Sequence, residues 1–190
     1  EVVGHERFNA ALSHARTQVP TQLTLVDADS SGVFEADEIA NVASREILTS
    51  RDRNHDGSVT PVELYSDVNR VESEYRPRRS IALGDARVEL IHPGDAHSVD
   101  TTVLYFPAER VVVTGDYVPS VMSPIEFAPD LPKDVIAWVR TVTALDFDLL
   151  LSGSGDVFTK QALLVLEQYL SDLDFGVRVG IASHWTIEEL

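Results

Sequence analysis

Cysteine is missing from this 190-residue sequence, which excludes disulfide bridges and thiolate zinc sites. Basic residues are scarce as well: 15 lysines and arginines stand against 31 aspartates and glutamates, and the formal net charge is -16. Such a surface repels phosphate backbones, so we expect no nucleic-acid partner. No stretch approaches the roughly 20 apolar residues that cross a bilayer, so we also expect no membrane span.

The first residues lack the usual start signals. Residues 1–6 carry neither an initiator methionine nor the basic start and apolar run of a secretory signal. We therefore expect a processed chain or a part of a longer one.

Helical and strand-like patterns alternate along the chain, which predicts an α/β or α+β protein. Apolar residues at helical spacing predict helices, and short or alternating apolar runs predict strands. The predicted helices are 1–18, 20–26, 133–145, 160–173 and 185–189. The predicted strands are 87–91, 102–106, 111–114 and 149–151.

An internal repeat relates two acidic segments, 27–38 and 52–63, at an offset of 25 residues. Each segment places oxygen-bearing residues at the first, third, fifth, ninth and twelfth positions. Calcium takes six to eight oxygen ligands, and a twelve-residue loop supplies them from these positions and from the seventh carbonyl. The predicted ligands of the first loop are Asp27, Asp29, Ser31, the carbonyl of Val33, Glu35 and bidentate Glu38. Those of the second are Asp52, Asn54, Asp56, the carbonyl of Ser58, Thr60 and bidentate Glu63.

The other loop positions agree with this interpretation. Gly32 and Gly57 occupy the sixth position, where the chain must turn through a conformation that other residues resist. The eighth positions hold Phe34 and Val59, and the pattern resembles an EF-hand pair, in which these residues join the loops through a short β-bridge. The bland alternative is a pair of acidic turns without metal. Because the single methionine, Met122, lies elsewhere, we expect a structural calcium site and no Met-rich groove for target helices.

A second resemblance begins at residue 87. Residues 92–97 read His-Pro-Gly-Asp-Ala-His, and residues 114–116 read Thr-Gly-Asp after a short apolar strand. This looks like the middle of a metallo-β-lactamase-fold hydrolase, and the resemblance implies zinc ligands at His97 and Asp116. It also implies that residues 1–19 and 76–190 form the C-terminal part of an αβ/βα sandwich. The EF-hand pair, 20–75, would then be an all-α insertion.

The sequence departs from that family at two points. The main motif, His-x-His-x-Asp-His, is missing from the chain and would lie upstream of Glu1. Ser154 stands where the late Gly-His-Gly ligand belongs. Two ligands remain, whereas catalytic zinc takes three protein ligands.

Two hypotheses stay open. In the first, the chain is part of a zinc-dependent hydrolase that acts on a small ester, thioester or lactone and carries a calcium-binding insertion. In the second, it is a non-catalytic calcium-binding module on a decayed hydrolase scaffold. Because low-affinity calcium sites fill most readily outside the cytoplasm, we expect a periplasmic or secreted location. The sequence gives no expectation for the oligomeric state.

Overall fold

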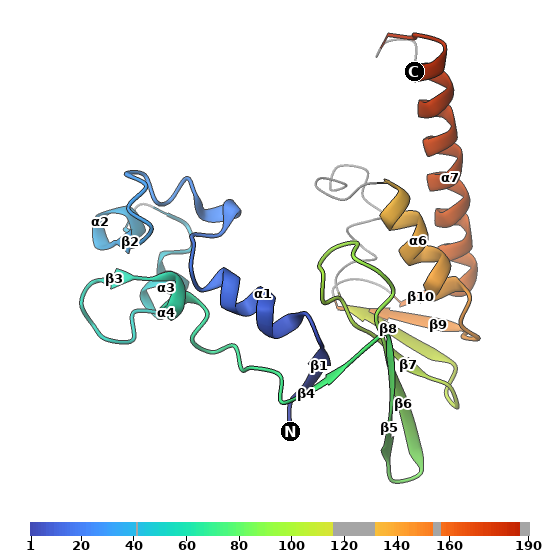
Figure 1. Cartoon of the computed structure of the whole chain (residues 1–190), viewed down its shortest axis with the longest axis horizontal. Helices are drawn as coiled ribbons and strands as arrows, with labels where there is room; N and C mark the ends of the chain where they lie inside the picture. Colours follow the sequence, from blue (N-terminus) through green and yellow to red (C-terminus); the bar gives the residue numbers. More distant parts are fainter. Residues whose placement is uncertain (41, 116–131, 154–156, 187–190) are drawn as a thin grey trace. The chain divides into compact units, whose positions relative to one another are not determined.

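Short helices and very short strands make up the first part of the chain, and a broad sheet with two longer helices makes up the second (Figure 1). The computed structural model describes residues 1–40, 42–115, 132–153 and 157–186. The chain divides into unit 1, Glu1–Glu74, and unit 2, Tyr75–Leu190.

Unit 1 is built from short elements around the two acidic loops. These elements are β1 (Val3–His5), α1 (Phe8–Ala15), the 3-10 turn η1 (Thr21–Leu23), β2 (Phe34–Glu35), α2 (Ala36–Ile39), α3 (Arg45–Thr49), β3 (Ser58–Val59), α4 (Pro61–Leu64) and β4 (Ser73–Tyr75). β1 pairs with β4, which explains why the predicted helix 1–18 begins only at Phe8. The segment predicted as a helix at 20–26 forms only the 3-10 turn.

Side-chain hydrogen bonds fasten the start of the chain to the segment after the second loop. The Asn9 amide donates to the carbonyl of Val71 and accepts from its N–H, both at 2.9 Å. The guanidinium of Arg16 donates to the carbonyls of Tyr65 and Val68, both at 3.0 Å. Residues 1–19 thus belong to the same unit as the two loops. Their assignment to the hydrolase-like domain stays a prediction.

The core of unit 1 is small and lies between the loops. Phe34 and Val59 are completely buried, and Ile39 and Leu48 are nearly so. The partly buried residues that pack around them are Val19, Leu23, Val26, Val42 and Leu64. Because each loop contributes a fully buried residue to one cluster, the two loops are held as a pair.

In its described residues, 75–115, 132–153 and 157–186, unit 2 contains a six-stranded sheet and two helices. Its strands are β5 (Arg78–Leu83), β6 (Ala86–Ile91), β7 (Val103–Phe106), β8 (Val111–Gly115), β9 (Leu149–Ser152) and β10 (Val157–Thr159). Its helices are α6 (Pro132–Thr143) and α7 (Lys160–Ala182). The strand order is β10-β9-β8-β7-β6-β5, in which β8 and β9 are parallel and the other neighbours antiparallel. The predicted α/β class is confirmed.

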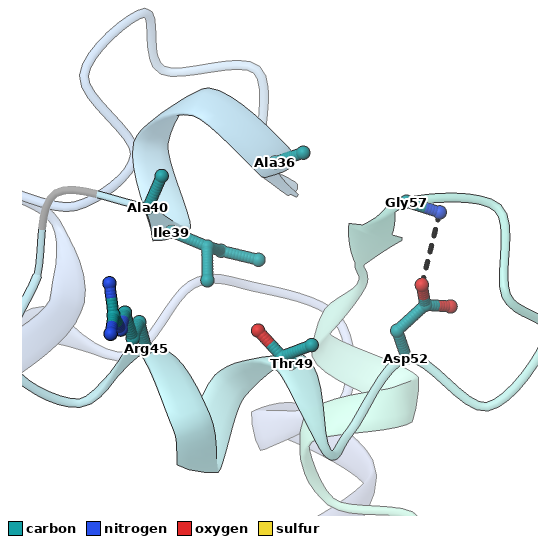
Figure 2. Close-up of a pocket in the computed structure, with 7 residues that line it drawn as sticks. All are labelled: Ala36, Ile39, Ala40, Arg45, Thr49, Asp52 and Gly57. Atoms are coloured by element: carbon teal, nitrogen blue, oxygen red, sulfur yellow. Dashed lines mark hydrogen bonds between the residues drawn. The ribbon is translucent and has the colours of Figure 1, made fainter.

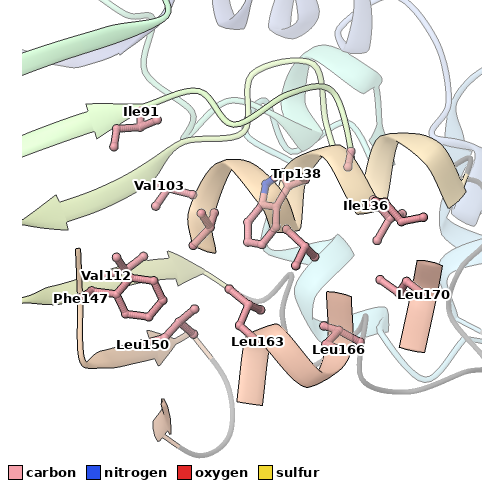
Figure 3. Packing of buried hydrophobic residues seen from close by; sticks show 14 of the residues in the cluster. Ile91, Val103, Val112, Ile136, Trp138, Phe147, Leu150, Leu163, Leu166 and Leu170 are labelled. Carbon is pink, nitrogen blue, oxygen red and sulfur yellow. The ribbon is translucent and has the colours of Figure 1, made fainter. Parts of the chain in front are cut away.

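The two helices cover one face of this sheet. Figure 3 shows Val103, Val112 and Leu150 from three strands facing Trp138 of α6. Leu163, Leu166 and Leu170 of α7 complete the same cluster. Since most of these side chains are at most 2% exposed, their burial provides most of the stabilisation of unit 2.

The opposite face of the sheet is apolar as well. One row of register partners crosses five strands, and it consists of Leu90, Leu104, Val113, Leu151 and Val157. Exposure rises toward the β10 edge, to 37% at Leu151 and 58% at Val157. A sheet with two apolar faces is typical of proteins that cover both of them.

α7 is longer than predicted and has a defined end. It continues past residue 173 to Ala182, where the N–H of Trp185 donates to the carbonyl of Gly180 and that of His184 to Ile181. His184 has a positive φ of 58°, as the residue after a helix end of this type requires. Of the described helices, including this one, none combines the length and apolarity that a bilayer crossing needs.

Arg110 joins the parallel strands β8 and β9 at their starts. Its guanidinium donates to both oxygens of Asp148, at 2.8 and 3.0 Å, and also contacts Asp146. Hydrogen bonds from Arg110 lower the pKa of Asp148 below its ordinary value. The ion pair therefore stabilises the folded state while Asp148 is ionised.

We expect Asp148→Asn to destabilise unit 2 modestly at pH 7, with the difference from the wild type shrinking as the pH falls through the depressed pKa of Asp148. The difference in stability shrinks toward low pH because a carboxyl whose pKa is lower in the folded state contributes stability only above that pKa. Urea unfolding followed between pH 7 and pH 3 measures this. Asp85→Asn, at an exposed hairpin position, is the matched control. A difference that stays constant over this range would contradict the role of the ion pair.

Candidate metal-binding loops

The first loop is shaped by an aspartate that accepts hydrogen bonds from the backbone ahead of it. Asp27 accepts from the N–H of Ser31 at 2.9 Å through one oxygen, and from that of Gly32 at 3.1 Å through the other. Asp29 also accepts from the N–H of Ser31, at 2.9 Å. The chain can fold back in this way because Gly32 takes a φ of 85°.

The second loop repeats this arrangement 25 residues later. Asp52 accepts from the N–H groups of Asp56 at 3.2 Å and Gly57 at 3.0 Å, and Figure 2 shows the second of these bonds. Asn54 accepts from the N–H of Asp56 at 2.8 Å, and Gly57 has a φ of 88°. The sequence repeat is therefore also a repeat of local structure.

The last residue of each loop is the third residue of a short helix, and it caps the start of that helix. Glu38 accepts from the N–H of Glu35 at 3.2 Å, and Glu63 accepts from that of Thr60 at 3.0 Å. Both pairs form capping boxes at the starts of α2 and α4. Glu38 also reaches back to the N–H of Ala28, at 2.6 Å. This bond draws the final carboxylate over the beginning of its own loop.

A two-residue bridge joins the loops. β2 and β3 are antiparallel, and Phe34 is the register partner of Val59. The predicted pairing of the two eighth positions is confirmed.

Acidic ligand atoms converge in the first loop. One oxygen from each of Asp27, Asp29 and Glu38 lies within 4.8 Å of the others, which is close enough to hold a metal ion. Within the described ranges, no other group of three aspartate, glutamate or histidine residues meets this distance. In the second loop, Asp56 instead accepts from the hydroxyl of Ser58 at 2.7 Å and from the amide of Asn54 at 2.9 Å.

The hydrogen bonds shift the pKa values of these carboxyls. The side-chain hydrogen bond with Glu38 raises the pKa of Glu35, and burial adds to this rise. Burial acts to raise the pKa of Glu38 as well, but hydrogen bonds from Glu35 and from backbone N–H groups outweigh it and lower the pKa. In the second loop, the N–H of Thr60 lowers the pKa of Glu63, and the hydroxyl of Ser58 lowers that of Asp56.

Among the described residues, two buried carboxylate oxygens accept no hydrogen bond. They are Oε2 of Glu35 and Oε1 of Glu63, and Glu63 as a whole is only 9% exposed. A buried polar atom without a partner is unfavourable, and more so when it carries charge. Since the predicted ligand positions include both residues, a cation is the partner that would satisfy these atoms.

Hollows adjoin both loops. One of about 500 Å³ is lined by Ala28, Asp29, Glu35, Asp37 and Glu38. Another of about 250 Å³ lies between α2, α3 and the second loop, next to Asp52 and Gly57 (Figure 2). The acidic lining of the first hollow gives a cation a path to the converging carboxylates.

The predicted zinc positions, His97 and Asp116, stay predictions. His97 is exposed at the turn after β6, with a φ of 71°, and belongs to no metal-ligand group of the described residues. Asp116 and Ser154 lie outside the described residues. His92, which the sequence did not distinguish from a surface histidine, has a side chain only 10% exposed. Its ring contacts the carbonyl of Thr101 at 2.8 Å and Asp95 at 3.2 Å.

The sequence did not indicate a group of ion pairs that supports the second loop. Asp67 pairs with Arg51 and Arg53, and Arg53 also donates to the hydroxyl of Ser66 at 3.2 Å. Asp67 lies four residues after the twelve-residue pattern, so no motif includes it.

Comparisons with known proteins give a resemblance to solved structures alone. No family model matches the sequence, and no curated protein matches it. A metallo-beta-lactamase from Pontibacter korlensis matches 57% of this chain and 53% of its own, with 14% identity and a TM-score of 0.45. The apo state of the chemotaxis sensor ODP from T. denticola matches 56% and 52%, with 20% identity and a TM-score of 0.44. The inverting sec-alkylsulfatase Pisa1 from Pseudomonas sp. matches 64% and 21%, with 14% identity and a TM-score of 0.48.

The chain spans about half the length of the first two of these proteins and a fifth of the third. With TM-scores below 0.5 and identities of 20% or less, these likenesses establish no family for this chain.

The turn at Gly57 gives a prediction that needs no metal. In a chelator, we expect Gly57→Val to lower the free energy of unfolding of unit 1 by about 1–2 kcal/mol, because a side chain resists positive φ. Gly57→Asn should cost clearly less, because asparagine tolerates that conformation better. No atom lies within 4 Å of a Cβ added there, so a steric clash does not contribute. Urea unfolding measures both variants, and equal losses would contradict this account of the turn.

Proposed function

We propose that unit 1 binds two calcium ions through an EF-hand pair formed by residues 27–38 and 52–63. The observation that carries the proposal is the repeated hydrogen-bond pattern of the two loops, in which Asp27 and Asp52 accept from the same relative N–H groups. In the first loop, oxygens of Asp27, Asp29 and Glu38 also converge. Calcium is the ion that takes six to eight such oxygens.

The first loop supports this with its other predicted ligands. The hydroxyl of Ser31 lies 3.2 Å from the carbonyl oxygen of Val33 and 3.1 Å from Oε1 of Glu35. The fifth, seventh and ninth positions therefore gather on the side where the carboxylates of Asp27, Asp29 and Glu38 converge. The proposed ligands of this loop are Asp27, Asp29, Ser31, Val33, Glu35 and Glu38.

The second loop supports it through a buried, unpartnered oxygen. Glu63 accepts from Thr60 through Oε2, at 3.0 Å from the N–H and 2.8 Å from the hydroxyl, while its buried Oε1 accepts no hydrogen bond from the part of the chain that the structure describes. A bidentate ligand at the twelfth position would use this second oxygen. The proposed ligands of this loop are Asp52, Asn54, Asp56, Ser58, Thr60 and Glu63.

The donor set favours calcium over other divalent ions. Both loops offer oxygen donors alone, whereas zinc prefers nitrogen and sulfur in a tetrahedron. Magnesium requires a nearly ideal octahedron and keeps much of its water. The first loop contributes four carboxylates and the second three, and their mutual repulsion falls when a divalent cation lies between them.

We expect calcium to raise the melting temperature of unit 1, because a ligand that binds only the folded state stabilises it. At 100 times the dissociation constant, one site contributes about 2.7 kcal/mol. The double variant Glu38→Gln, Glu63→Gln should lose this rise. Asp37→Asn is the matched control, since Asp37 lies in the first loop but at a position that is not a predicted ligand.

Differential scanning calorimetry with calcium and with a chelator measures the effect, and titration calorimetry gives the number of ions. A rise that survives in the double variant would reject the ligand assignment. A wild type without calcium uptake at millimolar concentration would reject the function.

We also propose that unit 2 is part of a zinc-dependent hydrolase of ester, thioester or lactone type, with His97 and Asp116 as zinc ligands. The supporting observation is strand direction: β6, β8 and β9 run the same way, so their carboxyl ends meet at one edge of the sheet. The turn with His97 follows β6, and the N–H of Gly153 after β9 donates to the carbonyl of Gly115 at 2.8 Å. Asp116 comes directly after Gly115 in the sequence.

The alternative is a non-catalytic calcium-binding module, and Ser154 at a ligand position favours it. After dialysis against zinc with calcium present, elemental analysis should find zinc on the wild type and less on His97→Ala. His14→Ala, on the exposed surface of α1, is the control. Equal zinc on all three proteins, or none on the wild type, would favour the alternative. For either function we propose a periplasmic or secreted location.

A further inference from the structure

The side of α7 that faces the core continues as an apolar stripe beyond it. Leu163, Leu166 and Leu170 are 2–7% exposed and belong to the core cluster, which ends at Leu170. The same side of the helix then carries a second triplet, with Leu173 at 45%, Val177 at 38% and Ile181 at 68% exposure. Figure 1 shows α7 continuing past the end of α6.

The spacing of these residues is that of a helix that packs against another helix. Steps of three and four residues lead from Leu163 through Leu170 to Val177, which is the seam of a two-helix contact. α6 occupies the first part of the seam, where Arg140 contacts Glu167 at 2.9 Å and Ser171 at 3.3 Å. The second part is therefore a helix-sized apolar surface.

We propose that the second triplet, Leu173, Val177 and Ile181, binds a second copy of this chain, with the two α7 helices antiparallel and crossing at Val177. A two-fold axis at Val177 places each Leu173 against Ile181 of the second copy and brings the two Val177 side chains together. Such a contact is isologous, because the same patch serves both copies.

Under this two-fold symmetry, the charges beside the triplet of one copy are complementary to those of the other copy. Asp174 and Arg178 lie on one flank of the stripe and form an ion pair at 2.7 Å, with the Arg178 side chain 67% exposed. In an antiparallel pair the same flanks meet, so Asp174 of each copy lies beside Arg178 of the other. A parallel arrangement would place this charged flank against the opposite flank of the other copy, where Gly176 lies, and would form no such charge pairs, which disfavours it.

The opposite flank permits close approach. Gly176 lies there, and no atom is within 4 Å of a Cβ added to it, so the space beside it is open. A lipid surface is a poorer partner, because the net charge is -16 and the last turn of α7 has no basic residue. These features together favour a second copy.

The interface is short, at two to three helical turns, so the dimer is weak. An area below about 1,200 Å² is typical of transient contacts, and we expect a dissociation constant on the order of 10–100 µM. Sedimentation equilibrium of the full chain over 5–500 µM should therefore show a monomer–dimer equilibrium. A chelator keeps calcium from contributing, so this experiment stands apart from the test of calcium binding.

Substitutions on the stripe should weaken the dimer without unfolding the chain, because these positions are exposed in the monomer. Val177→Asp should raise the dissociation constant about 100-fold, since it places two unpaired charges at the centre of the contact. Phe175→Asp is the matched control, because Phe175 is 70% exposed but projects from the other side of the helix. It should leave the dimer unchanged.

A charge exchange tests the orientation. Arg178→Asp should weaken the dimer, and the double variant Asp174→Arg, Arg178→Asp should restore it. Circular dichroism confirms that each variant is folded. A wild type that stays monomeric at 500 µM, or a dimer that Val177→Asp leaves intact, would overturn the proposal. A monomer that cosediments with phosphatidylcholine vesicles would also overturn it and would assign the stripe to a lipid surface.

Discussion

Backbone N–H groups that point inward at carboxylates are the interaction on which the loop unit depends. Asp27 and Asp52 each accept two such bonds, and Glu38 and Glu63 accept others from the starts of the helices that follow. Carboxylates this close together repel one another, and the N–H dipoles offset part of that repulsion. The loops thereby keep their shape at the cost of leaving some negative charge uncompensated.

The short elements of unit 1 share a small apolar core. Of the described residues, four buried apolar ones form the cluster between the loops, and Phe34 and Val59 of this cluster come from the bridge. A core this small stabilises its surroundings only modestly. Phe34 and Val59 pair across the bridge and pack in one cluster, so the shape of one loop depends on that of the other.

The sequence predicted the local features best. Loop boundaries, the glycine turns and the Phe34–Val59 bridge all follow from a twelve-residue pattern, and the structure contains each of them. The sequence did not predict the full length of α7. Glycine and valine have low helix propensity, and they weaken the helical pattern after Leu173. The ion pairs of Asp67 and the hydrogen bonds between Asn9 and Val71 link residues that are far apart in sequence, and no local pattern indicates them.

The pairing of β1 with β4 has a consequence for how such a chain could have arisen. β1 (Val3–His5) lies near the start of unit 1 and β4 (Ser73–Tyr75) at its end, so the two ends of the unit are neighbours in space. A module with adjacent ends can be spliced into a surface turn of a host, or cut out of it, without rerouting the host's backbone. Recombination could therefore move the loop pair between scaffolds as a cassette.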